Sequence, residues 1–239
     1  MHIPVQAPRE FTEKYLGVYD AGWDALREDR LMRAVQVGLL PGKVPMARMD
    51  TTGDWDALSD ARKQYESKRM AVYAGMIEAM DDNIGRLMAY LQAQGALDNT
   101  VFVFTSDNGA EGSGPVDPLT GPNSLVTANM GYSTDYETLG LKGSFSSIGP
   151  GFTSAAASPL AFYKFYTGEG GLRVPLIVSG QPLGNIPKQT DAFAWATDIA
   201  ATIIALANVA SPEARYGGRP VLPMTGRDLT PEEYDKIEM

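Results

Sequence analysis

The sequence predicts an α/β fold with a mainly parallel sheet flanked by helices, and two neighbouring patterns carry this prediction. Residues 60–94 place apolar side chains at helical spacing, and the pattern ends at Gly95, a residue type that commonly terminates helices. After a short turn, residues 101–105 form a continuous apolar run, which is typical of a strand buried on both faces. A long helix, a short turn and a doubly buried strand together favour a parallel sheet with this helix packed against it.

The other elements are predicted in chain order from the same kinds of pattern. Charged residues of alternating sign indicate a solvated helix within residues 8–38, and prolines and glycines then indicate a loop over 39–60. Residues 109–157 lack a sustained period and are expected to form a long loop. Further on, the patterns predict a short helix at 160–166, a second buried strand at 174–178 and an apolar helix at 197–209.

Composition excludes several classes of protein and of chemistry. The chain has 239 residues, of which 44% are hydrophobic and 21% are charged, as in ordinary globular proteins. Its net charge of −9 makes nucleic acid an unexpected partner, and no apolar run approaches the length of a bilayer. The chain has no cysteine, which excludes disulfides, thiolate metal ligands and thiol nucleophiles. The opening MHIPVQAP lacks the regions of a signal peptide and is typical of the inside of a loop.

The end of the first predicted strand carries the clearest candidate for chemistry. Asp107, Asn108 and Gly109 follow it directly, in a sheet type whose ligand sites gather at the carboxyl ends of strands. Carboxylate and amide oxygens are ligands that calcium and magnesium prefer. The spacing alone favours an Asx turn that closes the strand, because Asp-Asn-Gly is a common turn sequence.

Two further segments relate this chain to a known family. They are the opening HIPVQAP at residues 2–8, and YKFYTGEGGLRVP at residues 163–175. Together with TSDNG at 105–109, and in this order, they resemble bacterial arylsulfatases, the type I sulfatases of the alkaline-phosphatase-like superfamily. The resemblance covers residues 2–228, and it implies the sulfatase-like α/β fold.

The resemblance implies a role for each matching residue. Asp107 and Asn108 match an acidic–amide pair that coordinates a divalent cation, usually Ca²⁺ with Mg²⁺ as the alternative. Lys164 matches a lysine that contacts the sulfate ester and assists departure of the alkoxide, and His2 matches a histidine that faces the sulfate. These four functional groups are expected to lie within about 10 Å of a common centre, the scale of a small-ligand pocket.

Three other residues near these motifs are interpreted as structural. Glu169 and Arg173 are expected to pair with each other or to cap the chain where it enters the second strand. Glu111 could approach a cation, but the simpler interpretation is an exposed loop glutamate.

The resemblance also shows which parts of the family pattern are missing. Type I sulfatases act through a formylglycine made from the cysteine or serine of a C/S-x-P-x-R motif, and this chain has no cysteine. Residues 211–215, SPEAR, place the proline directly after the serine and do not fit the motif. Residues 1–210 are therefore predicted to be the C-terminal part of the catalytic domain, without its N-terminal strands. Residues 211–239 are predicted to be a tail that leads toward a missing C-terminal subdomain.

The predicted function of the complete enzyme is hydrolysis of sulfate monoesters, with aryl or small alkyl esters as the expected substrates. This chain is expected to be inactive alone. Two alternatives remain open: a phosphonate or phosphate monoesterase of the same superfamily, and a non-catalytic fragment completed by a partner chain. The expected partners are a small sulfate ester and a missing N-terminal half, without nucleic acid or membrane. The sequence leaves open whether the compartment is cytoplasmic or periplasmic.

Overall fold

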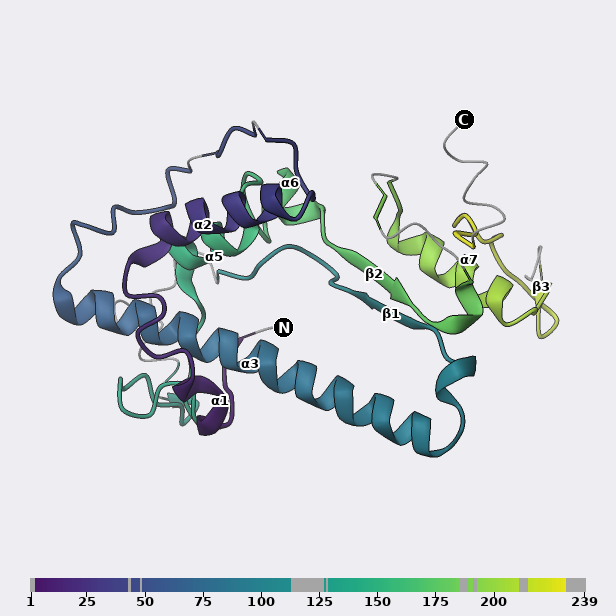
Figure 1. Ribbon diagram of the computed structural model, residues 1–239, viewed down its shortest axis with the longest axis horizontal. Helices are drawn as coiled ribbons and strands as arrows, with labels where there is room; N and C mark the ends of the chain where they lie inside the picture. The colour runs from purple at the N-terminus through teal and green to yellow at the C-terminus, as the bar shows by residue number, and fades with distance from the viewer. Residues whose placement is uncertain are drawn as a thin grey trace. The chain divides into compact units, whose positions relative to one another are not determined.

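The chain divides into two compact units in the computed structural model, which Figure 1 shows as a ribbon. The first unit comprises Met1–Tyr90 and Asn108–Pro175, and the second comprises Leu91–Asp107 and Leu176–Met239. The structure describes residues 3–42, 44–47, 49–112, 127, 129–184, 189–190, 193–210 and 215–230.

The first unit is helical. Its elements are α1 (Arg9–Glu13), α2 (Gly22–Gln36), most of α3 (Asp60–Ala93), α5 (Gly149–Ala157) and α6 (Glu169–Leu172). The predicted helix over 60–94 is confirmed as α3. The predicted helix within 8–38 is divided into α1 and α2, and Gly17 at φ +83° lies in the break between them. The predicted short helix at 160–166 is wrong, because these residues form turns and bends.

An aromatic cluster forms the core of this unit. Trp23 of α2, Trp55 and Phe152 of α5 meet edge to face, with ring centroids 4.8–5.9 Å apart. The helices α2 and α5 lie side by side, as Figure 1 shows. Gly151 permits this approach, because a Cβ there would come within 2.4 Å of the Trp23 ring. The prediction of a loop over 109–157 is therefore wrong at its end, where a small-residue helix is buried against aromatic rings.

A buried ion pair lies beside this core. The Arg69 side chain of α3 is 2% exposed, and its guanidinium donates to both carboxylate oxygens of Glu66 at 2.8 and 3.0 Å. Its other nitrogens donate to the carbonyl and the hydroxyl of Ser147. Arg62 also contacts Glu66, at 2.6 Å. A buried charge needs partners of this kind, so the network fixes the segment that leads into α5.

The second unit contains two short two-stranded sheets. Its elements are η1 (Leu97–Asn99), β1 (Phe102–Thr105), β2 (Leu176–Ser179), η2 (Gln181–Leu183), α7 (Ala196–Leu206), β3 (Arg215–Tyr216) and β4 (Arg219–Pro220). The predicted strands at 101–105 and 174–178 correspond to β1 and β2, and the predicted apolar helix corresponds to α7. β3 and β4 form a small hairpin within the predicted tail.

The pairing of β1 with β2 corrects the predicted sheet. The two strands run antiparallel, with Phe102 opposite Ser179 and Thr105 opposite Leu176, and each pairs with no other strand in the described chain. An apolar run predicts that a strand is buried. The relative direction of two strands depends on the path of the chain between them, so the apolar pattern did not determine that direction. The prediction of a mainly parallel sheet is wrong for the described strands. Packing of α3 against this sheet stays a prediction.

The expected burial of the first strand is also not found within the described chain. Phe104 is 40% exposed and its cross-strand partner Ile177 is 56% exposed on one face, and Val103 is exposed on the other. The helix α7 is apolar around most of its surface, yet Asp198 is its one buried residue. The described residues of this unit therefore leave apolar surface uncovered. Among the described residues, no helix is both long and apolar enough to cross a bilayer.

Candidate functional site

The loop that follows β1 is fixed by a close backbone contact. Gly109 donates its N–H to the carbonyl of Gly171 at 2.9 Å. A Cβ on Gly109 would lie 1.8 Å from the carbonyl oxygen of Gly170, so a glycine is required at this position. The contact joins the DNG motif to the EGG motif, which the sequence separates by about 60 residues. Two of the segments that carry the resemblance are thus held together.

Lys164 is attached to the same loop by its backbone and by its side chain. Its N–H donates to the carbonyl of Ala110 at 3.1 Å, and its Nζ lies 2.9 Å from the Oε2 of Glu111. The Lys164 side chain is 20% exposed, whereas that of Glu111 is 7% exposed. The expectation that Glu111 is an exposed loop glutamate is therefore wrong. Its burial follows from a tertiary contact that the sequence around it does not indicate.

Aromatic residues flank Lys164 on both sides, and the one before it is buried. Tyr163 is 1% exposed, which anchors the chain immediately before Lys164. Phe162 and Phe165 have φ values of +69° and +81°, in a region that residues other than glycine rarely adopt. Such backbone persists where the surrounding structure enforces it, and it gathers at functional sites. The local conformation is consistent with a lysine that is held in place for a task.

The four predicted site residues are brought together only in part. Asn108 is half-buried, in the first unit, and lies two residues before the carbonyl that binds Lys164. Asp107 is exposed and belongs to the second unit. His2 lies outside the described residues. The structure thus places Lys164 beside the loop that contains Asn108, and the convergence of all four groups stays a prediction.

The donor set of this loop fits part of a cation site. Calcium takes six to eight oxygen ligands in proteins, and Asp107 with Asn108 can supply one carboxylate and one amide oxygen. The residues that the structure describes contain no group of three or more histidine, cysteine, aspartate or glutamate side chains placed to hold a metal ion. A complete centre would therefore need ligands beyond this pair.

Glu169 and Arg173 have the structural role that the sequence predicts. Their side chains pair across one turn, with Arg173 Nη1 3.3 Å from Glu169 Oε2, and both are well exposed. Ion pairs this exposed contribute little to stability. The pair lies just before β2 in the sequence and has no part in the contact around Lys164.

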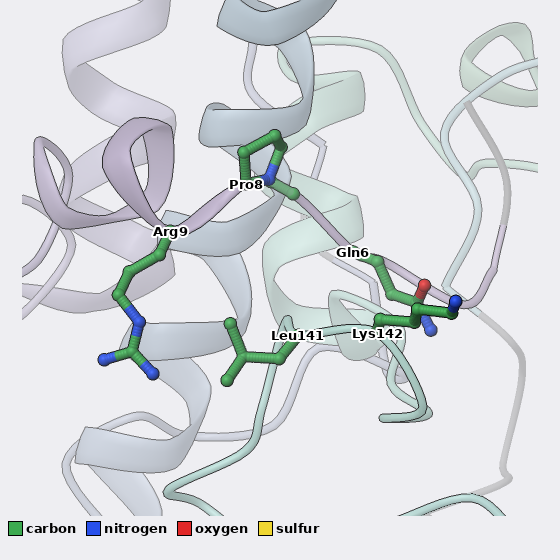
Figure 2. Close-up of a pocket in the computed structure, with 6 residues that line it drawn as sticks. Gln6, Pro8, Arg9, Leu141 and Lys142 are labelled. Atoms are coloured by element: carbon green, nitrogen blue, oxygen red, sulfur yellow. The ribbon is translucent and has the colours of Figure 1, made fainter.

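The pocket drawn in Figure 2 is separate from these residues. It has a volume of about 560 Å³ and is lined by Gln6, Ala7, Pro8, Arg9, Leu141 and Lys142. Figure 2 shows the charged ends of Arg9 and Lys142 pointing away from each other across Leu141. Their two cations do not converge on one ligand, so the pocket carries no argument for anion binding.

Asp198 is a buried carboxylate whose structural role the sequence did not reveal. It accepts the backbone N–H of Trp195 at 2.9 Å and so closes a capping box at the start of α7. It also accepts the backbone N–H of Arg227 at 2.8 Å and its guanidinium at 3.1 Å. Burial acts to raise the pKa of Asp198, but the hydrogen bonds from Arg227 and Trp195 together hold that pKa below its usual value.

Comparison with known proteins identifies the family. The Sulfatase family model matches residues 1–209. The chain is 38% identical over 229 residues to an uncharacterized sulfatase of Schizosaccharomyces pombe, covering 95% of this chain and 41% of that protein. It is 31% identical over 232 residues to an arylsulfatase of Klebsiella aerogenes, covering 96% of this chain and 48% of that protein. The chain thus spans less than half the length of these two relatives.

A solved structure also matches, with a TM-score of 0.38 and 24% identity, over 74% of this chain and 25% of that one. It is described as a complex with its substrate, D-glucosamine-2-N,6-O-disulfate. The family model covers well over half of this chain, including the segments on both sides of Lys164. The chain therefore belongs to the sulfatase family, whose fold is α/β.

Proposed function

We propose that this chain is part of a sulfuric ester hydrolase that cleaves small sulfate monoesters of the aryl type. The observation that carries the proposal is the attachment of Lys164 to the loop that follows β1, through Ala110 and Glu111. Membership of the sulfatase family supports the reaction class, and the similarity to an arylsulfatase supports the aryl leaving group.

The residues of this chain would serve the reaction mainly through positive charge. Hydrolysis of a sulfate monoester gathers negative charge on the sulfate oxygens and on the departing alkoxide. The Lys164 ammonium would bind a sulfate oxygen and stabilise the departing oxygen, and His2 would face the same sulfate. Asp107 and Asn108 would hold a divalent cation, with calcium the favoured ion, whose charge polarises the sulfate oxygens.

The chain does not supply a nucleophile for this reaction. It has no cysteine from which formylglycine could be made, and its SPEAR segment has the wrong spacing. We infer that the nucleophile and the remaining cation ligands come from other parts of the catalytic domain. In the two relatives, more than half of the protein lies outside the region that matches this chain. The assignment of this chain to the C-terminal part of that domain rests on the order of its motifs.

The uncovered apolar surface of the second unit supports a role as one part of a larger assembly. Phe104 and Ile177 are exposed on one face of the β1–β2 pair, and Val103 is exposed on the other. Two-stranded sheets with bare apolar faces are marginal in water. The occupant that we propose for this surface is the rest of the sulfatase catalytic domain, on the same or on a second polypeptide.

The reading frame upstream of Met1 tests this proposal. We expect it to encode a C/S-x-P-x-R motif, in phase or in a neighbouring frame. Expression of the joined sequence should yield turnover of nitrophenyl sulfate, and Lys164→Ala should lower that turnover by at least about 100-fold. Faster turnover of nitrophenyl phosphate or of a phosphonate ester would assign the enzyme to the other branch of the superfamily. Upstream DNA without such a motif would contradict an interrupted sulfatase.

A further inference from the structure

The ion pair between Lys164 and Glu111 places a negative charge beside the cation that is proposed to bind sulfate. The two charged atoms lie 2.9 Å apart, and both side chains are mostly shielded from solvent. The backbone bond from Lys164 to Ala110, the residue before Glu111, holds both side chains to one short loop. The carboxylate is therefore a fixed feature of the site and not a mobile surface charge.

An anion bound to this ammonium must lie close to the Glu111 carboxylate. A lysine ammonium has three donors, and two acceptors on one ammonium are separated by about 5 Å. At that distance, and with little solvent between them, two negative charges repel each other appreciably. The repulsion grows in proportion to the charge of the incoming anion, so it acts twice as strongly on a dianion as on a monoanion.

The oxyanions that could compete for this site differ in charge. A sulfate monoester carries one negative charge, because the sulfur group has a single ionised oxygen left after esterification. Inorganic sulfate carries two, and phosphate groups carry between about 1.5 and 2 at neutral pH. A lone lysine would favour the dianions. A lysine already paired with a carboxylate offers them no such advantage.

We propose that Glu111 is a specificity-determining residue that makes the Lys164 site favour singly charged sulfate monoesters over doubly charged oxyanions. The proposal rests on the proposed function of Lys164 as a sulfate-binding group. Glu111 weakens retention of the sulfate product, and it disfavours phosphate monoesters as substrates. Specificity here comes from a repulsive element built against the wrong ligand as well as from attraction to the right one.

Titration with two probe anions tests this assignment on the 239-residue chain. The probes are inorganic sulfate, with two charges, and methyl sulfate, with one charge on the same kind of head group. Binding is followed by NMR at the Lys164 amide, at constant ionic strength. We expect Glu111→Gln, which removes the charge and keeps the shape, to strengthen methyl sulfate binding by about tenfold and sulfate binding by about a hundredfold. The ratio of the two dissociation constants should therefore shift by about tenfold.

Three variants separate the possible outcomes. Glu111→Asp keeps the charge and should leave the ratio within about twofold of the unmodified chain. Glu169→Gln removes a charge from the exposed pair with Arg173 and should also leave it unchanged. Lys164→Met should abolish binding of both anions.

The unmodified chain gives an expectation that needs no variant. Methyl sulfate should bind at least as tightly as inorganic sulfate, in spite of its smaller charge. Tighter binding of inorganic sulfate, or a ratio that Glu111→Gln leaves unchanged while Lys164→Met abolishes binding, would overturn the role of Glu111 and leave that of Lys164 intact. Binding that survives Lys164→Met, or no binding of either anion, would overturn the proposed function of Lys164 and this inference with it.

Discussion

The two units of this chain differ in how far their apolar side chains are buried. The first unit surrounds Phe152 with two tryptophans and encloses the Glu66–Arg69 pair, so its core is closed within the described chain. The second unit exposes Phe104 and Ile177 on a two-stranded sheet. The first unit therefore has the packing contacts of a folded domain. The second unit has apolar residues typical of a core, but the described residues do not cover them.

The largest expected effect concerns catalysis by the free chain. With no nucleophile and an incomplete cation site, the isolated chain should hydrolyse nitrophenyl sulfate no faster than the buffer does. Enzymes without their nucleophile can keep an advantage over water of about a thousandfold, but only when the rest of the site is intact. The measurement is release of nitrophenol with added calcium or magnesium. Turnover that Asp107→Ala abolishes would show that the chain has a working site by itself.

A pair of phenylalanine variants measures the contrast between the units directly. Phe152→Ala removes a fully buried ring from the aromatic cluster and should lower the free energy of unfolding by about 3–5 kcal/mol. Phe104→Ala removes a ring that is already partly in water, and should cost less than about 1.5 kcal/mol. Urea unfolding followed by circular dichroism gives both values. Equal losses would mean that Phe104 is buried in solution, and that the two units do not differ in the burial of their apolar residues.

The buried ion pair tests the first unit in a second way. Glu66→Ala leaves the Arg69 guanidinium without its bidentate partner in a buried position, which should cost about 3 kcal/mol. Glu169→Ala breaks an exposed pair with Arg173 and should cost at most about 1 kcal/mol. Thermal unfolding of the two variants makes the comparison. A loss for Glu66→Ala as small as the control loss would indicate that water reaches Arg69.

The smallest expected effect is the dependence of the stability of the second unit on acidic pH. Hydrogen bonds from Arg227 and Trp195 overcome the opposing effect of burial, so the pKa of Asp198 is lower folded than unfolded. Asp198 therefore contributes stability that is fully present above its unfolded pKa of about 3.9 and is lost as pH falls through the lower folded value. Asp198→Asn should remove this part of the acid dependence, as measured by melting temperatures between pH 2 and 6. An unchanged pH profile in the variant would show that Asp198 does not titrate with unfolding.

The sequence by itself determined the family, the long helix and the identity of the site motifs. Periodicity over 60–94 gave α3 because helix formation depends mainly on local spacing. The order of the TSDNG and EGGLRVP segments was enough to place the chain among sulfatases. Each motif consists of consecutive residues, so it can be recognised without knowledge of the tertiary structure.

Tertiary structure alone decided the direction of β1 against β2, the burial of α5 and the contact of Lys164 with Glu111. Each of these depends on residues far apart in the chain, and their approach leaves no local periodicity. A run of apolar residues predicts that a strand is buried, but it does not predict which other part of the chain packs against that strand. A glutamate in a glycine-rich loop likewise gives no local sign that a lysine 53 positions away will hold it out of the solvent.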